Sequence, residues 1–349
     1  MVFSRLWAQR FKKAVAFGLA ALSTSPLYAQ DVQKTSASVV MYHRFGEADY
    51  PSTNIKMEQF EAHIEEIKNG GYTVLPLPEL VDLLNAGKPL PDKALSITID
   101  DGYASIYEKA YPKFKEAGIP FTIFISTDPI DRGYAKHLTW KQVKEMSDDP
   151  LVYIGAHTAS HLHMPASSEA RIGSEMERSL ARFEEKLGYR PDIFAYPYGE
   201  ASLKAMSVVR GFGMRAAFGQ HSGAVGSGDN QFYLPRFALN EKYGDIKRFQ
   251  MVAQAKSLHV RDLGPKDMTI AKRNPPMIGF TVDESVGSLS PLACFASHEG
   301  KVRLEKLWER RIEVRMEKAL PVGRTRLNCT MPAGDGRWRW FGRIFYVAP

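Results

Sequence analysis

The sequence has only two cysteines among its 349 residues, Cys294 and Cys329, and both lie near the C-terminus. A structural zinc site normally has four protein ligands, so two cysteines cannot form a cysteine zinc site by themselves. They could form one disulfide bond or remain two buried thiols. We expect the disulfide if the protein is exported, because an oxidising compartment preserves such bonds.

Long apolar segments, repeats and basic runs are also lacking. No apolar run approaches the roughly 20 residues that a membrane-spanning helix needs, so no stable membrane span is expected. The net charge is +7, and residues 261–349 hold 16 Lys and Arg against 10 Asp and Glu, but no long basic run occurs. We therefore expect no nucleic-acid partner. The oligomeric state is not indicated by these features.

The first 29 residues have the pattern of a secretory signal peptide. Four basic residues precede a short apolar segment at 14–22, and Pro26 and the small Ala29 follow it. This order of regions is typical of a cleaved leader, with cleavage expected after Ala29. We therefore expect export to the periplasm or the extracellular space. A short amphipathic or anchoring helix is the alternative interpretation.

Segments with the patterns of strands and helices alternate through the body of the chain, residues 30–260. Strands are predicted at 37–43, 72–77, 94–100, 120–127, 151–158 and 192–199. Helices are predicted at 57–69, 78–87, 104–117, 139–146, 167–188 and 201–210. This alternation favours an α/β fold with a parallel sheet, either open or closed into a barrel.

The pattern changes after about residue 272. Six short segments with alternating apolar residues and turn signals between them follow, and no helical period is sustained. This pattern predicts a small all-β sandwich domain over residues 272–349, for which carbohydrate binding is one function to consider.

Two polar clusters follow predicted strands. Asp100 and Asp101 end the strand at 94–100, and His157 and His161 follow the strand at 151–158. A spacing of four would place both imidazoles on one side of a helical turn, within reach of one ion. Either cluster alone is weak evidence, since an Asp pair is commonly a helix cap and His-x-x-x-His occurs by chance.

Together the two clusters predict a metal-assisted hydrolysis. One carboxylate and two neutral imidazoles make a three-ligand site that leaves a position open for water or substrate. A divalent cation at Asp101 would keep that carboxylate ionised beside its neighbour. Asp100 would then be free to accept a proton from the attacking water. Zinc is the expected ion, with cobalt and nickel as alternatives.

The order of three motifs resembles the polysaccharide deacetylases of carbohydrate esterase family 4, the NodB-homology group. These motifs are TIDDG at 98–102, HTASH at 157–161 and YPYG at 196–199. The resemblance covers roughly residues 37–245. It implies a distorted (β/α) barrel and removal of N-acetyl groups from amino sugars. It also implies that Asp100 is the catalytic base and that Asp101, His157 and His161 bind the metal.

Two features depart from the family pattern. An Arg that steadies the base usually precedes the Pro-Tyr of the third motif, but Ala195 and Tyr196 stand there. Arg236 is our candidate for its replacement. The late Leu-x-His that supplies the general acid is also absent.

A different histidine is therefore expected to be the general acid. The segment VVMYHRF ends the first predicted strand with His43 and resembles the biofilm poly-β-1,6-N-acetylglucosamine deacetylase branch, whose barrel is circularly permuted. We expect His43 to be the acid, with His221 as the second choice. A purely structural hydrogen bond is the alternative role for His43.

Three further residues are expected to contact substrate. Pro197 and Tyr198 belong to the third motif, and Tyr198 resembles the residue whose backbone N–H polarises the substrate carbonyl. Trp140 could line a sugar site, although a core position at a helix start fits it equally well. His163 does not have the spacing to bind the same ion, so we expect it behind the ligands or at the surface.

The function predicted from the sequence is metal-dependent N-deacetylation of an amino-sugar polysaccharide, of the exopolysaccharide or cell-wall type. Two alternatives remain open at this point. One is a non-catalytic carbohydrate-binding relative, and the other is an O-acetyl esterase with the same metal site. The polymer, its linkage and the native metal are not encoded in recognisable motifs.

Overall fold

A nine-stranded sheet is the centre of the computed structural model, which describes residues 35–271 and 273–349. The predicted signal peptide lies outside the described residues. The main strand order is β10-β1-β5-β6-β7-β8-β9, while β11 pairs with β1 and β4 with β5. Every pairing is parallel except β1 with β10. The strands are β1 (Ser36–Tyr42), β4 (Thr73–Val74), β5 (Ala94–Asp101), β6 (Phe121–Ile125), β7 (Val152–Ala156), β8 (Ile193–Ala195), β9 (Ala216–Phe218), β10 (Val225–Gly226) and β11 (Phe237–Ala238).

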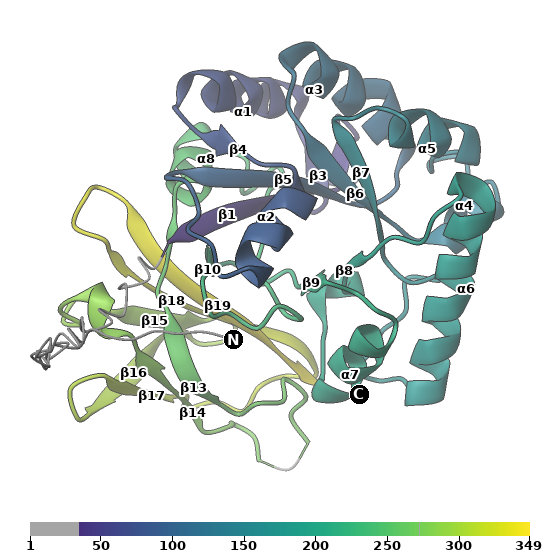
Figure 1. Ribbon diagram of the computed structural model, residues 1–349. Helices are drawn as coiled ribbons and strands as arrows, with labels where there is room; N and C mark the ends of the chain where they lie inside the picture. Colours follow the sequence, from purple (N-terminus) through teal and green to yellow (C-terminus); the bar gives the residue numbers. More distant parts are fainter. Residues whose placement is uncertain (1–34, 272) are drawn as a thin grey trace, which may run out of the picture. The chain divides into compact units, whose positions relative to one another are not determined.

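Helices separate most of these strands, as the alternation predicted. In Figure 1, α1, α3, α5 and α6 lie along the outer side of β5, β6 and β7. Strand β5 is buried along its whole length except at Asp101, as is typical of a strand in a parallel sheet. The helices are α1 (Met57–Asn69), α2 (Leu77–Asn85), α3 (Tyr111–Ala117), α4 (Thr127–Asp131), α5 (Trp140–Ser147), α6 (Glu169–Leu187), α7 (Leu203–Gly211) and α8 (Ile246–Ala253).

Local signals explain where the longest helix begins and ends. The Ser168 side chain accepts a hydrogen bond from the backbone N–H of Arg171 at the start of α6. Gly188 ends the helix with φ of 83°, a conformation that glycine adopts without steric cost. The sequence analysis missed α8, and it placed one continuous helix over 104–117 where the structure has a π-helical turn, Ile106–Ala110, before α3.

The segment 234–238 links the two ends of the sheet. Leu234 forms a parallel bridge with Phe218 of β9, and β11 then pairs with β1. One short stretch of chain thus lies against strands from both ends of the order. This arrangement is consistent with the expected distorted barrel, and it places Arg236 between the two contacts.

A second sheet, of eight strands, follows. Its order is β12-β19-β18-β15-β16-β17-β14-β13, and most pairings are antiparallel. Its buried apolar side chains form a cluster of their own. The strands are β12 (Lys256–Ser257), β13 (Val260–Gly264), β14 (Ile278–Val282), β15 (Ala293–Ala296), β16 (Gly300–Leu307), β17 (Arg311–Arg315), β18 (Gly323–Pro332) and β19 (Trp338–Val347).

The predicted division of the chain into two domains stays a prediction. The second sheet is made of the antiparallel strands that the sequence indicated, but it already begins at β12, upstream of residue 272. The described residues group into one compact unit rather than two. Two short elements, β2 (Arg44–Phe45) and β3 (Asn54–Ile55), form a separate pair. Among the described residues, no helix is both long and apolar enough to cross a membrane.

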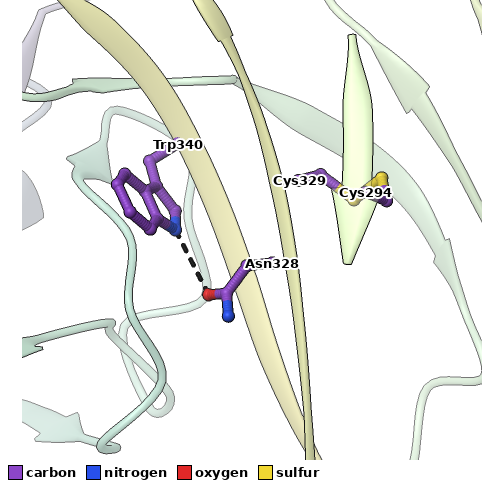
Figure 2. The surroundings of a disulfide bond; sticks show 4 residues. All are labelled: Cys294, Asn328, Cys329 and Trp340. Atoms are coloured by element: carbon purple, nitrogen blue, oxygen red, sulfur yellow. Dashed lines mark hydrogen bonds between the residues drawn. A yellow bond between two sulfur atoms is a disulfide. The ribbon is translucent and has the colours of Figure 1, made fainter. Parts of the chain in front are cut away.

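The two cysteines form a disulfide within the second sheet, which is the pairing that the sequence analysis expected in the case of export. Cys294 of β15 lies directly opposite Cys329 of β18 in the register of the strands. Figure 2 shows this bond beside the hydrogen bond that Trp340 Nε1 donates to Asn328 Oδ1, at 3.2 Å. Trp340 also packs edge-on against Phe237 of β11, so it joins the second sheet to the first.

Loss of this disulfide is expected to destabilise the protein. The bond closes a loop with a sequence separation of 35 residues, and a loop of this size corresponds to about 3–4 kcal/mol through the lost entropy of the unfolded chain. A Cys294→Ser/Cys329→Ser double variant should therefore unfold at lower denaturant concentration than the oxidised parent. Full reduction of the parent should give a similar midpoint, and equal midpoints for oxidised parent and variant would contradict the expectation.

Candidate functional site

The register of the parallel strands brings the polar strand ends to one edge of the first sheet. Tyr42 of β1 pairs with Ile99 of β5, so His43 and Asp100 follow at the same level. Ile125 of β6 pairs with both Asp101 and Ala156, and His157 comes directly after Ala156. Carboxyl ends of parallel strands share one edge, so residues far apart in the sequence meet here.

Asp101, His157 and His161 form a group that could hold a metal ion. One ligand atom of each lies within 4.8 Å of the others. Asp101 Oδ1 is 3.4 Å from His157 Nε2 and 3.2 Å from His161 Nε2. Burial acts to raise the pKa of Asp101, but the imidazoles of His157 and His161 beside it and the charge of His43 outweigh this effect, so its pKa lies well below the usual value. The carboxylate is therefore ionised.

The polar atoms of this group fit a cation. His157 Nδ1 lies 2.7 Å from the carbonyl oxygen of Ala195, so this nitrogen carries the proton and donates to the carbonyl. His157 Nε2 then has a lone pair directed toward Asp101 Oδ1. Both atoms are buried, and neither has a hydrogen-bond partner among the described residues. Two buried acceptors facing each other are costly unless a cation lies between them.

The helical turn predicted for residues 157–161 is wrong, although the two histidines do meet. The segment is a loop, and both Thr158 and His161 have left-handed backbones, with φ of 62° and 59°. Asp101 and Tyr198 share this conformation, with φ of 77° and 60°. Left-handed backbone is unfavourable for residues other than glycine, and such strain gathers at functional sites.

Asp100 forms a doubly hydrogen-bonded ion pair with Arg236. Arg236 Nη1 donates to Asp100 Oδ1 at 2.7 Å and Nη2 donates to Oδ2 at 2.8 Å, and both side chains are fully buried. Arg236 Nε is fixed in turn by the carbonyl oxygen of Gly219, at 2.9 Å. Burial acts to raise the pKa of Asp100, but the charges of Arg236 and His157 outweigh it and lower the pKa. Arg236 therefore occupies the place expected of the missing Arg.

His43 lies close enough to the group for its titration to be coupled to it. Burial lowers the pKa of His43, while the charges of Asp101 and Asp100 act to raise it. The structure thus brings together six of the predicted residues: His43, Asp100 and Arg236, together with the group Asp101, His157 and His161.

In the described part of the chain, the contacts of His221 do not connect it to Asp101, His157 or His161. Its ring stacks on Tyr233 with a centroid distance of 4.3 Å, and it lines a cavity of about 300 Å³ beside β19 of the second sheet. Burial and the charges of Arg343 and Arg236 lower the pKa of His221 to about 3. The described contacts therefore place His221 at this cavity, while His43 lies at the level of Asp100 on the neighbouring strand.

Pro197 and Tyr198 form a tight turn beside the metal-ligand candidates. They belong to a 3₁₀ element, Pro197–Gly199. The Tyr198 ring meets His161 edge-on at 4.3 Å and stacks flat on His163 at 3.8 Å. The His163 side chain is 52% exposed and pairs with Glu200, so it lies at the surface beside this turn, which is one of the two positions expected for it.

Trp140 is not brought to the site by any contact of the described residues. Its indole N–H donates to Asp131 Oδ1 at 2.7 Å, and its ring lies edge-on to Phe183 of α6. It packs against the main core of the protein. The structure therefore places it partly buried against the core, close to the alternative that the sequence analysis had left open, and its substrate role stays a prediction without support.

The sequence analysis missed three residues near the site. Gln220 Nε2 donates to Asp100 Oδ2 at 3.3 Å. Glu200 is buried and pairs with His163 Nδ1 at 2.9 Å. Arg324 of β18 donates from Nη1 to the carbonyl oxygen of Tyr198 at 2.9 Å. Glu200 directly follows the YPYG motif and could have been noticed there, but Arg324 has no local signal.

The fold and the site together are typical of a class of hydrolases. The strand ends of the parallel sheet hold a possible metal site, and Asp100, paired with Arg236, lies beside it. Residues 87–217 match the family model for polysaccharide deacetylase. The chain therefore carries a polysaccharide deacetylase domain, and its relatives and structural neighbours indicate a deacetylase hydrolase. The matched range includes Asp100 and both histidines of the cluster, whereas His43, Arg236 and Arg324 lie outside it.

Individual relatives agree with this assignment. The chain is 29% identical over 202 residues to YxkH of Bacillus subtilis, which carries a provisional assignment as a polysaccharide deacetylase; the match covers 58% of this chain and 71% of that protein. It is 26% identical over 235 residues to the poly-beta-1,6-N-acetyl-D-glucosamine N-deacetylase of Staphylococcus aureus, with 60% and 80% covered. The solved structure of IcaB from Ammonifex degensii superimposes with a TM-score of 0.58 at 25% identity, covering 63% of this chain and 98% of that one.

Proposed function

We propose that the protein removes N-acetyl groups from an amino-sugar polysaccharide in a metal-dependent hydrolysis. The observation that carries this proposal is the pairing of Asp100 with Arg236 immediately beside the Asp101, His157 and His161 group. A relative of the chain is named as an N-deacetylase of poly-beta-1,6-N-acetyl-D-glucosamine. We take a polymer of this kind as the first substrate to test.

Asp101, His157 and His161 would hold one divalent ion, for which zinc is our first choice. When bound, the ion supplies Lewis-acid chemistry: it lowers the pKa of water and polarises the acetyl carbonyl. Three protein ligands leave a position open for water or substrate, as a catalytic rather than structural site requires. The fixed tautomer of His157, set by the Ala195 carbonyl, keeps its Nε2 lone pair available.

Asp100 would accept the proton of the attacking water. Its lowered pKa keeps it ionised, and the two hydrogen bonds from Arg236 hold the carboxylate in one orientation. A positioned base contributes about 10²–10⁴-fold to such a reaction. Because the ion pair is fully buried, the carboxylate cannot rotate away into solvent.

His43 would deliver a proton to the departing amine, and the Tyr198 backbone N–H would stabilise the charge that develops on the acetyl oxygen. His43 follows β1 at the level of Asp100 on β5. A base and an acid carried by neighbouring strands can act on the two ends of one scissile bond. The Tyr198 role comes from the family resemblance, and its position against His161 supports that role.

Acetate release provides the direct test of this function. The mature protein should release acetate from N-acetylated poly-β-1,6-glucosamine, lose this activity on chelation, and recover it when Zn²⁺, Co²⁺ or Ni²⁺ is added back. A matched O-acetylated polymer without N-acetyl groups should react more slowly. Faster reaction with the O-acetyl polymer would favour an esterase instead, and no hydrolysis of either polymer would indicate a non-catalytic relative.

Replacement of His43 by alanine is expected to reduce turnover on the amide by roughly 10²–10⁴-fold, with metal content retained. An ester substrate should be affected less, because its leaving group needs less protonation. The matched variant is His221→Ala, which removes the other histidine that was considered. Full activity of His43→Ala together with an inactive His221→Ala would overturn the assignment of the acid.

We also propose that the protein acts after export, in the periplasm or the extracellular space. The disulfide between Cys294 and Cys329 supports this location, because such bonds persist in oxidising compartments. The leader-like residues 1–29 agree with it. Fractionation of cells that express the full chain, followed by N-terminal sequencing of the mature protein, would test both export and the expected cleavage after Ala29.

A further inference from the structure

A residue of the second sheet contacts the turn that carries Tyr198. Arg324 lies on β18, where its register partner is Tyr346 of β19. Its Nη1 donates to the carbonyl oxygen of Tyr198 at 2.9 Å, although the two residues are 126 positions apart. Its Nε lies 3.5 Å from Glu200 Oε1, and its guanidinium lies 5.6 Å from the centre of the Tyr198 ring. One planar group therefore contacts two residues of the same turn.

A series of contacts leads from Arg324 to His161, one of the metal-ligand candidates. Glu200 is almost fully buried, and its Oε2 lies 2.9 Å from His163 Nδ1. The His163 ring stacks on Tyr198, and Tyr198 meets His161 edge-on. An unpaired carboxylate in this position would be costly, so the nearby charge of Arg324 stabilises it together with His163. These contacts form a continuous path from β18 to the site.

The rest of the turn is already closely packed. Tyr233 donates its hydroxyl to the Gly199 carbonyl at 3.1 Å. A Cβ added to Gly199 would lie 2.4 Å from the backbone nitrogen of Gln220, and Gly199 has φ of 69°, so only glycine fits there. Tyr198, whose backbone has the left-handed conformation, lies between Gly199 and the contact with Arg324. Strained backbone of this kind persists only where its surroundings hold it.

We propose that Arg324 is a positioning residue for the deacetylation, so that the second sheet completes the site rather than serving only as an attached module. Its hydrogen bond to the Tyr198 carbonyl fixes the peptide planes of the turn, and hence the direction of the Tyr198 backbone N–H. Its contact with Glu200 fixes the stack of His163 on Tyr198. This inference rests on the proposed function, in which that N–H stabilises the charge on the acetyl oxygen.

Kinetics of Arg324 variants of the full chain would test the inference. Removing a well-placed donor to a developing oxyanion costs roughly 10²–10³-fold in kcat, and loosening its direction should cost less. We expect kcat of Arg324→Ala to fall by about 10- to 100-fold. KM should change by about twofold at most, since the lost interaction belongs to the transition state.

Two further variants separate positioning from a general loss of charge or stability. Arg324→Lys should recover only part of kcat, because an ammonium lacks the planar fork that reaches both Tyr198 and Glu200. Arg303→Ala removes an exposed arginine of the same sheet whose ion pair is with Glu305, and its kcat should equal that of the parent. Unchanged kcat in Arg324→Ala, or the same loss in Arg303→Ala, would overturn the inference.

Amide hydrogen exchange supplies a readout that does not depend on catalysis. The amides of Gly199 and Glu200 donate to the carbonyls of Tyr196 and Pro197, so they report on the order of the turn. In Arg324→Ala they should exchange about tenfold faster, while Arg303→Ala should leave them unchanged. Unchanged exchange in Arg324→Ala overturns the positioning role even if the parent is active. Faster exchange in Arg324→Ala, beside a parent that releases no acetate, would keep the role of Arg324 in ordering the turn and would reject the proposed function separately.

Discussion

Replacing His157 by alanine is expected to abolish stoichiometric binding of a divalent ion and, with it, acetate release. His157 supplies one of three ligand atoms, and the remaining Asp101 and His161 would leave a two-ligand site. Loss of several kcal/mol of charge stabilisation in the transition state corresponds to a fall in turnover on the order of 10³-fold. Metal analysis of the purified variant, with turnover measured on the same sample, would check both expectations.

His163→Ala is the matched control for metal content. It removes a histidine of the same loop, but one that pairs with Glu200 and stacks on Tyr198 instead of facing Asp101. This variant should retain one equivalent of metal. If His157→Ala also retained one equivalent, or if His163→Ala lost it, the ligand assignment would be wrong.

Asp100→Asn is expected to keep the metal and lose turnover by roughly 10²–10⁴-fold, because an amide cannot accept the proton of the attacking water. Asp101→Asn should lose both metal and turnover, since this change removes the charge that faces the ion. Metal content and kcat measured side by side would separate the two adjacent carboxylates. Equal metal loss in both variants would contradict the division of roles.

Stability must be measured along with turnover, because Asp100 and Arg236 form a fully buried pair. Breaking such a pair from one side typically costs about 3–5 kcal/mol, since the remaining charge is left without its partner. Asp100→Asn should therefore also lower the denaturation midpoint. An Asp100→Asn/Arg236→Gln double variant should recover part of this stability but none of the turnover. Recovered turnover in the double variant would show that Asp100 acts only as a partner for Arg236.

The prediction from sequence was strongest where the chemistry is local. Asp100 and Asp101 end a nearly continuous apolar strand, and His157 follows another, so their types and strand-end positions were visible in the sequence. Parallel strands place such ends at one edge, and this is why the metal-ligand group could be predicted. The helical turn over 157–161 was wrong because left-handed residues such as Thr158 and His161 have no propensity signal when they are not glycine.

The partner of Asp100 could be suggested but not placed. Arg236 lies 136 residues away from Asp100, beside strand β11, which has only two residues. Its guanidinium reaches Asp100 because this segment pairs with β9 on one side and with β1 on the other. Short strands carry almost no periodicity, so their pairing cannot be predicted from the pattern. Trp140 shows the opposite case, in which an aromatic residue suited to sugar binding is partly buried against the core instead.

The sequence by itself determined which strands end in acidic and imidazole side chains, that helices alternate with those strands, and that two cysteines were available for one bond. Each of these features is local, because it depends on residue type and on periods of two to four residues. Only the tertiary structure decided which arginine pairs with Asp100, which histidine lies beside it, and that Arg324 of the second sheet holds the Tyr198 turn. Those contacts depend on strand register and sheet closure, which bring together residues far apart in the sequence and leave no mark on the sequence near them.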